Sequence, residues 1–257
     1  MALRFAVCTI SQILLIHPLL AEVVAVSHPA GVTHGFLAMQ SQDGHSIASG
    51  DMDQTTTGNE VTAHVVFRFK DGSIDDETVV YSQQKHFRLL RYHLVQKGAA
   101  YPHPLDLRID APSGQVTVHY TEDGKERVVT QHLDLPPDLA NGMIPTLLQN
   151  IPANAPALKV SMLAATPKPR LVKLAITNDG EDPFFVGTAR HKATHFIVRL
   201  QIGGIAGLLA PLLGKQPPDT HVWIMRSEAP VFVKSEGARY LGGPIWRIEL
   251  AKPSWPA

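Results

Sequence analysis

Cysteine is almost absent from the sequence, and so is any excess of charge. The only cysteine is Cys8, close to the N-terminus. Lys and Arg together number 23, and so do Asp and Glu. A chain without a cysteine pair forms no internal disulfide, so its stability must come from a hydrophobic core. The neutral balance argues against a nucleic-acid partner, whose phosphates require a basic excess, and against electrostatic binding to a membrane surface.

The N-terminus has the pattern of a secretory signal peptide. Arg4 supplies a positive charge, an apolar stretch follows, and small residues suited to cleavage stand at Ala21 and Ala25. The apolar run is shorter than the ~20 residues that a membrane span needs. We therefore expect a signal peptide over 1–25 and a protein in the periplasm or secreted, with no integral membrane segment after cleavage. The absence of an Asn-x-Ser/Thr sequon makes a bacterial envelope the simpler compartment.

Turn signals recur along the chain and predict tight connections between antiparallel strands. Gly follows Asp or Ser at 42–44, 70–72, 113–114, 122–124 and 178–180, and such pairs supply the positive φ that hairpin turns require. Between the turns, apolar and polar residues alternate. The residues that we expect on a buried face are Val61, Ala63, Val65, Phe67 and Phe69, then Val116, Val118 and Tyr120, then Phe196, Val198, Leu200 and Ile202, and finally Trp246, Ile248 and Leu250.

This pattern predicts an all-β, mainly antiparallel protein of a dozen or more strands. We expect one large curved meander sheet or half-barrel, possibly two packed sheets. Residues 26–257 would form a single domain. The proline-rich stretch 152–169 marks a possible seam between an N-terminal and a C-terminal meander.

Two apolar stretches interrupt the strand pattern, and we expect both to cover the concave face of the sheet. In 137–150, Pro137 suits a first helical turn and the apolar residues fall near helical spacing, while Pro145 would kink or split the helix. In 202–214, several glycines and Pro211 disfavour one long helix. Either stretch could complete a packed core or close over a hydrophobic ligand.

The sequence offers no convincing catalytic motif. Ser46 lies in GlyHisSerIleAla, but a nucleophile elbow needs a helix after the serine, and the polar, β-branched residues that follow are unsuited to one. The acidic runs 75–77 and 178–182 lack the spacing of a calcium loop and are interpreted as turn and strand-edge acids. The protein is therefore expected to be non-enzymatic, with no cofactor.

Thirteen histidines raise the question of a metal site. On one strand, His191 and His195 would lie about 13 Å apart, too far to share one ion without a bend. Solvated surface histidine is the default interpretation for these two and for His64, His119, His132 and His221, and no metal is expected. A metal site formed by histidines that converge from different strands is an alternative that the sequence leaves open.

The C-terminal stretches 221–225 (HisValTrpIleMet), 228–234 and 242–250 (GlyGlyProIleTrpArgIleGluLeu) resemble the closing strands of uncharacterised secreted bacterial β-sheet proteins. More broadly, the signal peptide, the curved meander and the apolar interruptions are similar to the architecture of LolA-type lipoprotein carriers. That architecture is an open half-barrel with helices as its lid. The resemblance implies compartment and fold, and it places no carrier residue on this chain.

These observations lead to a hypothesis of non-enzymatic binding of a hydrophobic molecule, such as a lipid or an acyl chain, under the two apolar segments. The residues expected to contact that ligand are Met143, Leu147, Leu208, Leu209, Leu212 and Leu213. The alternative is a structural or interaction protein of the bacterial envelope with a fully packed interior and exposed strand edges for partners.

Overall fold

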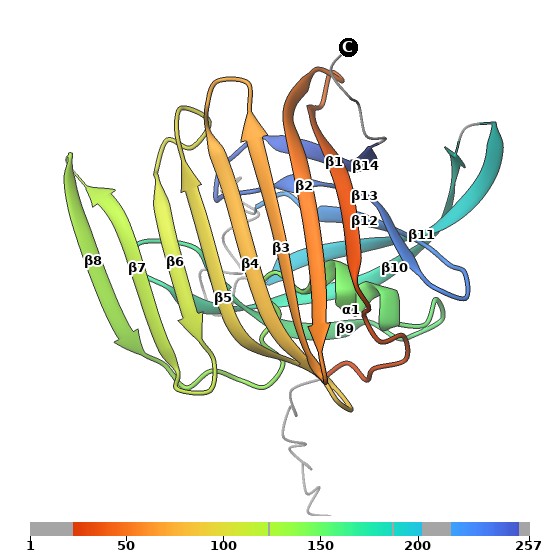
Figure 1. Ribbon diagram of the computed structural model, residues 1–257, viewed down its shortest axis with the longest axis horizontal. Coiled ribbons are helices and arrows are strands. Elements are labelled where there is room, and N and C mark those ends of the chain that lie inside the picture. The colour runs from red at the N-terminus through yellow and green to blue at the C-terminus, as the bar shows by residue number, and fades with distance from the viewer. Residues whose placement is uncertain (1–22, 123, 187, 202–216, 252–257) are drawn as a thin grey trace, which may run out of the picture.

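The computed structural model describes residues 23–122, 124–186, 188–201 and 217–251. These residues form a single antiparallel sheet of 14 strands that curls on itself, with one short helix between its two walls (Figure 1). The expectation of an all-β protein built on one large curved meander is confirmed. The apolar stretch 202–214, with its predicted ligand contacts, lies outside the described residues and connects strand β11 to strand β12.

The sheet consists of two meanders. The first contains β1 (Thr33–Ser41), β2 (Ser46–Thr57), β3 (Glu60–Phe69), β4 (Ile74–Gln83), β5 (Phe87–Lys97), β6 (Leu105–Asp110), β7 (Gln115–Glu122) and β8 (Lys125–His132). The second contains β9 (Leu158–Ala164), β10 (Arg170–Val186), β11 (Ala189–Gln201), β12 (Thr220–Met225), β13 (Val231–Ala238) and β14 (Ile245–Ala251). The meanders join in the middle of the sheet, where β1 pairs with β14 and Phe36 faces Ala251.

The two free edges of the sheet are therefore β8 and β9, which are consecutive in sequence. The connection between them, 133–157, crosses the space inside the curl and carries helix α1 (Ile144–Asn150). The proline-rich stretch 152–169 covers the end of this connection, β9 and the turn into β10.

The predicted turns are present in four of the five places. Gly44, Gly72 and Gly124 have φ values of 86°, 84° and 72° in the connections that follow β1, β3 and β7. Gly114, in the connection after β6, has φ 73°. The turn predicted at 178–180 is wrong. Gly180 has φ 96°, but the register shifts between Asn178 and Glu181, so this glycine forms a bulge and β10 continues beyond it.

Helix α1 is shorter than the predicted 137–150. Proline at the first positions of a helix loses no hydrogen bond, and Pro145 accordingly lies in the first turn of α1 rather than kinking a longer helix. Residues 138–141 instead run beside β9: the N–H of Ser161 donates to the carbonyl of Asp138 (3.1 Å), and the N–H of Leu163 donates to Asn141 Oδ1 (2.8 Å). These contacts cover the outer edge of β9.

The guanidinium of Arg226, in the turn after β12, closes the other end of α1. It donates to the carbonyls of Leu148 (3.1 Å), Gln149 (3.2 Å) and Ile151 (2.6 Å). The last carbonyls of a helix have no partner within the helix, so this arginine attaches the helix to the second wall of the sheet.

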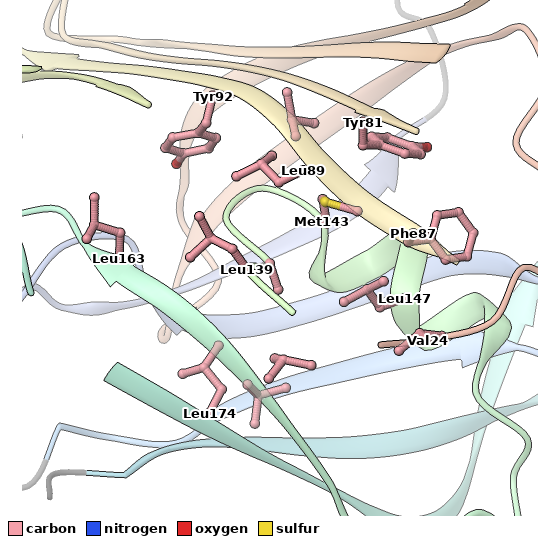
Figure 2. Packing of buried hydrophobic residues seen from close by; sticks show 14 of the residues in the cluster. Val24, Tyr81, Phe87, Leu89, Tyr92, Leu139, Met143, Leu147, Leu163 and Leu174 are labelled. Carbon is pink, nitrogen blue, oxygen red and sulfur yellow. The ribbon is translucent and has the colours of Figure 1, made fainter. Parts of the chain in front are cut away.

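Two clusters of buried side chains fill the interior. The helix cluster surrounds α1 and is mainly aliphatic; Figure 2 shows part of it, with Leu89, Leu139, Met143, Leu163 and Leu174 among the labelled side chains. The aromatic cluster lies around the β1–β14 seam and includes Phe67, Phe69, Tyr101 and Trp246. The predicted buried faces are confirmed at most positions, although Leu250 is 43% exposed.

An N-terminal strap, residues 23–31, seals the helix cluster. The N–H of Phe87 donates to the carbonyl of Val24 (3.0 Å), and Val24 is buried. Asn150 at the end of α1 accepts the N–H groups of Ser27 (2.9 Å) and His28 (2.6 Å) on its Oδ1. The strap thus attaches the first described residues to the central helix.

Candidate functional site

The predicted ligand contacts Met143 and Leu147 lie inside the helix cluster, where they are 1% and 4% exposed. Figure 2 shows both side chains between Tyr81 and Phe87 on one wall and Leu174 on the other. They line a cavity of about 10 Å³, together with residues that include Val24, Phe87, Leu139 and Val160. The other four predicted contacts, Leu208, Leu209, Leu212 and Leu213, lie outside the described residues.

This cavity is far smaller than a ligand pocket. Sites for small molecules usually enclose about 300–1,000 Å³, whereas about 10–15 Å³ suffices for one water. At about 10 Å³, the space beside Met143 and Leu147 is comparable to that of a single water. The interior described around α1 is a packed core.

A buried ionic network separates the helix cluster from the aromatic cluster. The carboxylate of Asp75 on β4 has no exposed surface and accepts two hydrogen bonds from Arg239 (3.0 and 2.8 Å). Tyr101 Oη (2.6 Å) and Gln96 Nε2 (3.1 Å) also donate to it. Arg239 follows β13 on the second wall, so the network joins the two walls directly. The interpretation of the run 75–77 as turn and strand-edge acids therefore does not describe Asp75, which is buried inside the curl.

The surroundings of Asp75 explain its ionisation. Burial by itself would raise the pKa of this carboxyl, but the charge and hydrogen bonds of Arg239, with those of Tyr101 and Gln96, hold the pKa below its ordinary value. The pKa of Tyr101 is raised by burial and by the charge of Asp75. Tyr101 therefore remains a hydrogen-bond donor. Glu77 extends the network, since it lies 3.4 Å from Arg239 Nη2 and accepts a hydrogen bond from Tyr92 Oη (2.7 Å). The arrangement is that of a hydrogen-bonded structural ion network.

A second hollow, of about 480 Å³, lies on the outer face of the first wall, away from α1. Antiparallel register places its side chains in two rows across four strands. One row contains Val80, Arg91, Asp110 and Gln115, and the other contains Thr78, His93, Arg108 and Thr117. The short side chains of Thr78, Val80 and Thr117 form the floor between longer charged ones.

The charges of the hollow are mixed. Arg91 Nη2 contacts Glu60 (3.1 Å), and Arg108 Nε contacts Asp106 (3.3 Å). Each guanidinium makes one such contact, and among the described residues its other N–H groups have no protein partner. The backbone and hydroxyl of Ser113 lower the pKa of Asp110 through hydrogen bonds. The hollow thus offers arginine donors, hydroxyls and one ionised carboxylate to a polar partner.

Histidines from two different strands meet on the outer face of the second wall. His195 Nε2 lies 2.8 Å from His221 Nδ1, and the ring of His195 stacks on Trp223 with 4.4 Å between centroids. Asp179 and Asp182 approach His195 Nδ1 at 3.3 and 3.6 Å. Burial, reinforced by His221, lowers the pKa of His195.

Sequence reasoning missed this arrangement because the two histidines are separated by the segment between β11 and β12. The interpretation of His195 as a solvated surface side chain is wrong, since its side chain is 12% exposed. His191 does not join it and instead packs against Phe184. Within the described ranges, no three His, Cys, Asp or Glu side chains gather as a metal-binding group.

Other candidates lie where the sequence suggested. Ser46 is exposed at the first residue of β2, with no helix after it. His64 and His93 project from the outer face and pair with Asp76 (2.9 Å) and Asp106 (3.0 Å). The part of the chain that the structure describes contains no helix with the length and apolar character needed to cross a membrane.

Comparison with known proteins yields little. No protein-family model matches the chain, and no curated protein matches it. Among solved structures, it is similar to a β-barrel-like protein of a domain of unknown function, DUF1849, from Brucella abortus. The TM-score is 0.49 at 8% sequence identity, over 88% of this chain and 98% of that one. The resemblance to LolA-type carriers stays a prediction.

Proposed function

We propose that this protein is an exported interaction protein of the bacterial envelope, with a packed interior and a polar binding site in the outer hollow of β4–β7. The single observation that carries the proposal is the contrast between the two spaces: about 10 Å³ beside α1 and about 480 Å³ on the outer face. A binding function needs room, and the outer hollow has it.

The chemistry of the hollow selects the partner. Arg91 and Arg108 retain N–H groups that can donate in pairs to a carboxylate or phosphate. Asp110 and the hydroxyls of Thr78 and Thr117 add hydrogen-bond acceptors. A partner that carries both an acidic group and hydrogen-bond donors therefore fits the hollow better than a simple anion does. We expect a polar segment of an envelope component, and no reaction is assigned to the site.

Photo-crosslinking in the native host tests this proposal. A photoreactive residue in place of Thr117, within the hollow, should give a defined adduct, and the double variant Arg91→Glu/Arg108→Glu should lose it. The matched control replaces Thr55, an exposed threonine on the outer face of β2. An adduct of equal yield at both positions, or one that survives the double charge reversal, would refute the proposal.

Binding of a lipid or acyl chain is the second candidate. It is favoured by one observation: Met143 and Leu147, chosen from the sequence as ligand contacts, line the cavity beside α1. Such a ligand would require α1 or the strap to move away from the sheet. Native mass spectrometry of the protein from its own host distinguishes the candidates, because bound lipid near one-to-one supports a carrier and a clean apo mass supports a packed scaffold.

A further inference from the structure

The hairpin of β10 and β11 extends past the rest of the sheet as a free-standing arm. β9 pairs with β10 only over Arg170–Ile176, and β12 pairs with β11 only over Ala193–Val198. Beyond those points the two strands pair only with each other, and Figure 1 shows the ribbon projecting away from both walls. An isolated two-stranded ribbon is at best marginally stable, so the arm depends on its attachment at the base.

Contacts at the bulge attach the base of the arm. Trp223 Nε1 donates to Asp182 Oδ2 (2.7 Å), and His195 lies against the same carboxylate. Lys192 Nζ contacts Glu181 Oε2 (3.1 Å). These contacts use the acidic side chains of the arm near its base, which leaves the end of the arm without acids among its described residues.

One face of the arm combines exposed apolar and basic side chains. Residues directly opposite in antiparallel strands point to the same face, and the register pairs Phe185 with Arg190 and Pro183 with Lys192. Phe185 is 66% exposed, although an aromatic ring of this size is usually buried. Arg190 is exposed and has no ion pair within the described residues.

We propose that this face of the arm, Pro183, Phe185, Arg190 and Lys192, docks the protein on a membrane surface that contains anionic lipids. Phe185 would enter the boundary between headgroups and acyl chains, while Arg190 contacts the headgroups and Lys192 stays paired with Glu181 at the base of the face. The arrangement is that of interfacial anchors, in which aromatic side chains and cations share one face.

Area favours a membrane over a protein as the partner. A stable protein interface buries about 800 Å² on each side, whereas the free part of this arm presents only a few side chains on each face of a narrow ribbon. A bilayer requires only that a few side chains enter it. The neutral balance of the whole chain concealed this site, because Lys192 is paired with Glu181 but Arg190 has no ion pair among the described residues.

Vesicle flotation of the protein, as its host processes it, tests the inference. Wild-type protein should float with mixed phosphatidylcholine/phosphatidylglycerol vesicles, bind pure phosphatidylcholine vesicles more weakly, and release from the mixed vesicles as salt is raised. Phe185→Ser and Arg190→Glu should each reduce the bound fraction about fivefold or more, the scale expected for one interfacial contact.

Matched controls are available on other parts of the surface. Leu241, in the loop after β13, is 69% exposed, and Lys97, at the end of β5, is also exposed. Leu241→Ser and Lys97→Glu should bind vesicles as wild type does. The inference is overturned if wild type binds neither vesicle, if the arm variants bind normally, or if the controls lose binding equally. Because the arm is remote in sequence and register from the hollow of β4–β7, these outcomes do not depend on the proposed function.

Discussion

The two halves of the interior are built on different principles. The helix cluster is mainly aliphatic and is closed by separate pieces of chain, α1 and the N-terminal strap. The aromatic cluster has rings in edge contact, such as Tyr101 and Trp246 at 5.9 Å, and is bounded by the charged pair of Asp75 and Arg239. Aliphatic packing tolerates small displacements, whereas a hydrogen-bonded ion pair has a defined geometry. The relative position of the two walls is therefore set by the ion pair beside the aromatic cluster.

Asp75→Asn should give the largest effect, a loss of about 3–5 kcal/mol in the free energy of unfolding, because the buried charge of Arg239 would keep only its longer contact with Glu77 (3.4 Å). Chemical denaturation at neutral pH measures it. Asp76→Asn, the neighbour that points outward to His64, is the control and should cost less than about 1 kcal/mol. Equal losses would mean that the network is not structural.

The same pair predicts how the aromatic end responds to acid. Since the folded state lowers the pKa of Asp75, its contribution is fully present above the ordinary carboxyl pKa and is lost as pH falls through the folded value. Asp75→Asn should therefore reduce the dependence of stability on pH below about 4, near the reference pKa of an aspartate.

Trp246→Ala should cost about 3–5 kcal/mol, because the indole is buried between Phe69 and Tyr101 and its removal leaves a cavity. Thermal and denaturant unfolding measure the change. Leu250→Ala, on the same strand but 43% exposed, should cost below about 1 kcal/mol. A cost below about 1 kcal/mol for Trp246→Ala would mean that the facing of β14 is inverted.

Leu147→Ala tests the helix cluster and should cost about 2–5 kcal/mol, as for other buried leucines. We expect a cost near the lower end of this range, because a shift of α1 into the vacated space would reduce the cavity. Leu171→Ala, at 42% exposed, is the control. A cost as small as that of the control would indicate that α1 is loosely held, and would favour the lipid-binding candidate.

His195→Gln should have a smaller effect, confined to the pH dependence of the free energy of unfolding. The folded state lowers the pKa of His195 through burial and His221, so the unfolded chain binds the proton more tightly. Stability should therefore decline as pH falls from about 6.5 through the folded value. The variant should show a shallower decline than wild type in denaturation measured across this pH range. Parallel slopes for wild type and His195→Gln would contradict this.

The last prediction concerns where the expected signal peptide would be cleaved. Val24 is buried and its carbonyl bonds to β5, so cleavage after Ala21 should preserve the helix cluster, whereas cleavage after Ala25 would remove part of the strap. Intact mass measurement of the protein recovered from its host distinguishes the two sites. A mature chain that begins at Val26 would contradict the assignment of Val24 to the core.

The strand pattern and most buried faces could be predicted from sequence, because alternation and Asp-Gly turns are local signals. The bulge at Gly180 could not be predicted, since the same residues suit a turn and only pairing with β11 distinguishes the two. The burial of Asp75 depends on Arg239, 164 residues away. The hollow on β4–β7 and the contact of His195 with His221 likewise depend on register between strands, which periodicity alone does not provide.

The seam between β1 and β14 makes the sheet a circular permutation of a simple meander. Across the sheet, starting at β9, the strands run from β9 to β14 and then from β1 to β8. If β14 were joined to β1 and the chain were opened between α1 and β9, all neighbouring strands would be consecutive in sequence. In the natural order, one essential pairing links the first strand to the last. The seam can close only after β14 has been synthesised, and a pairing so distant in sequence is expected to form slowly.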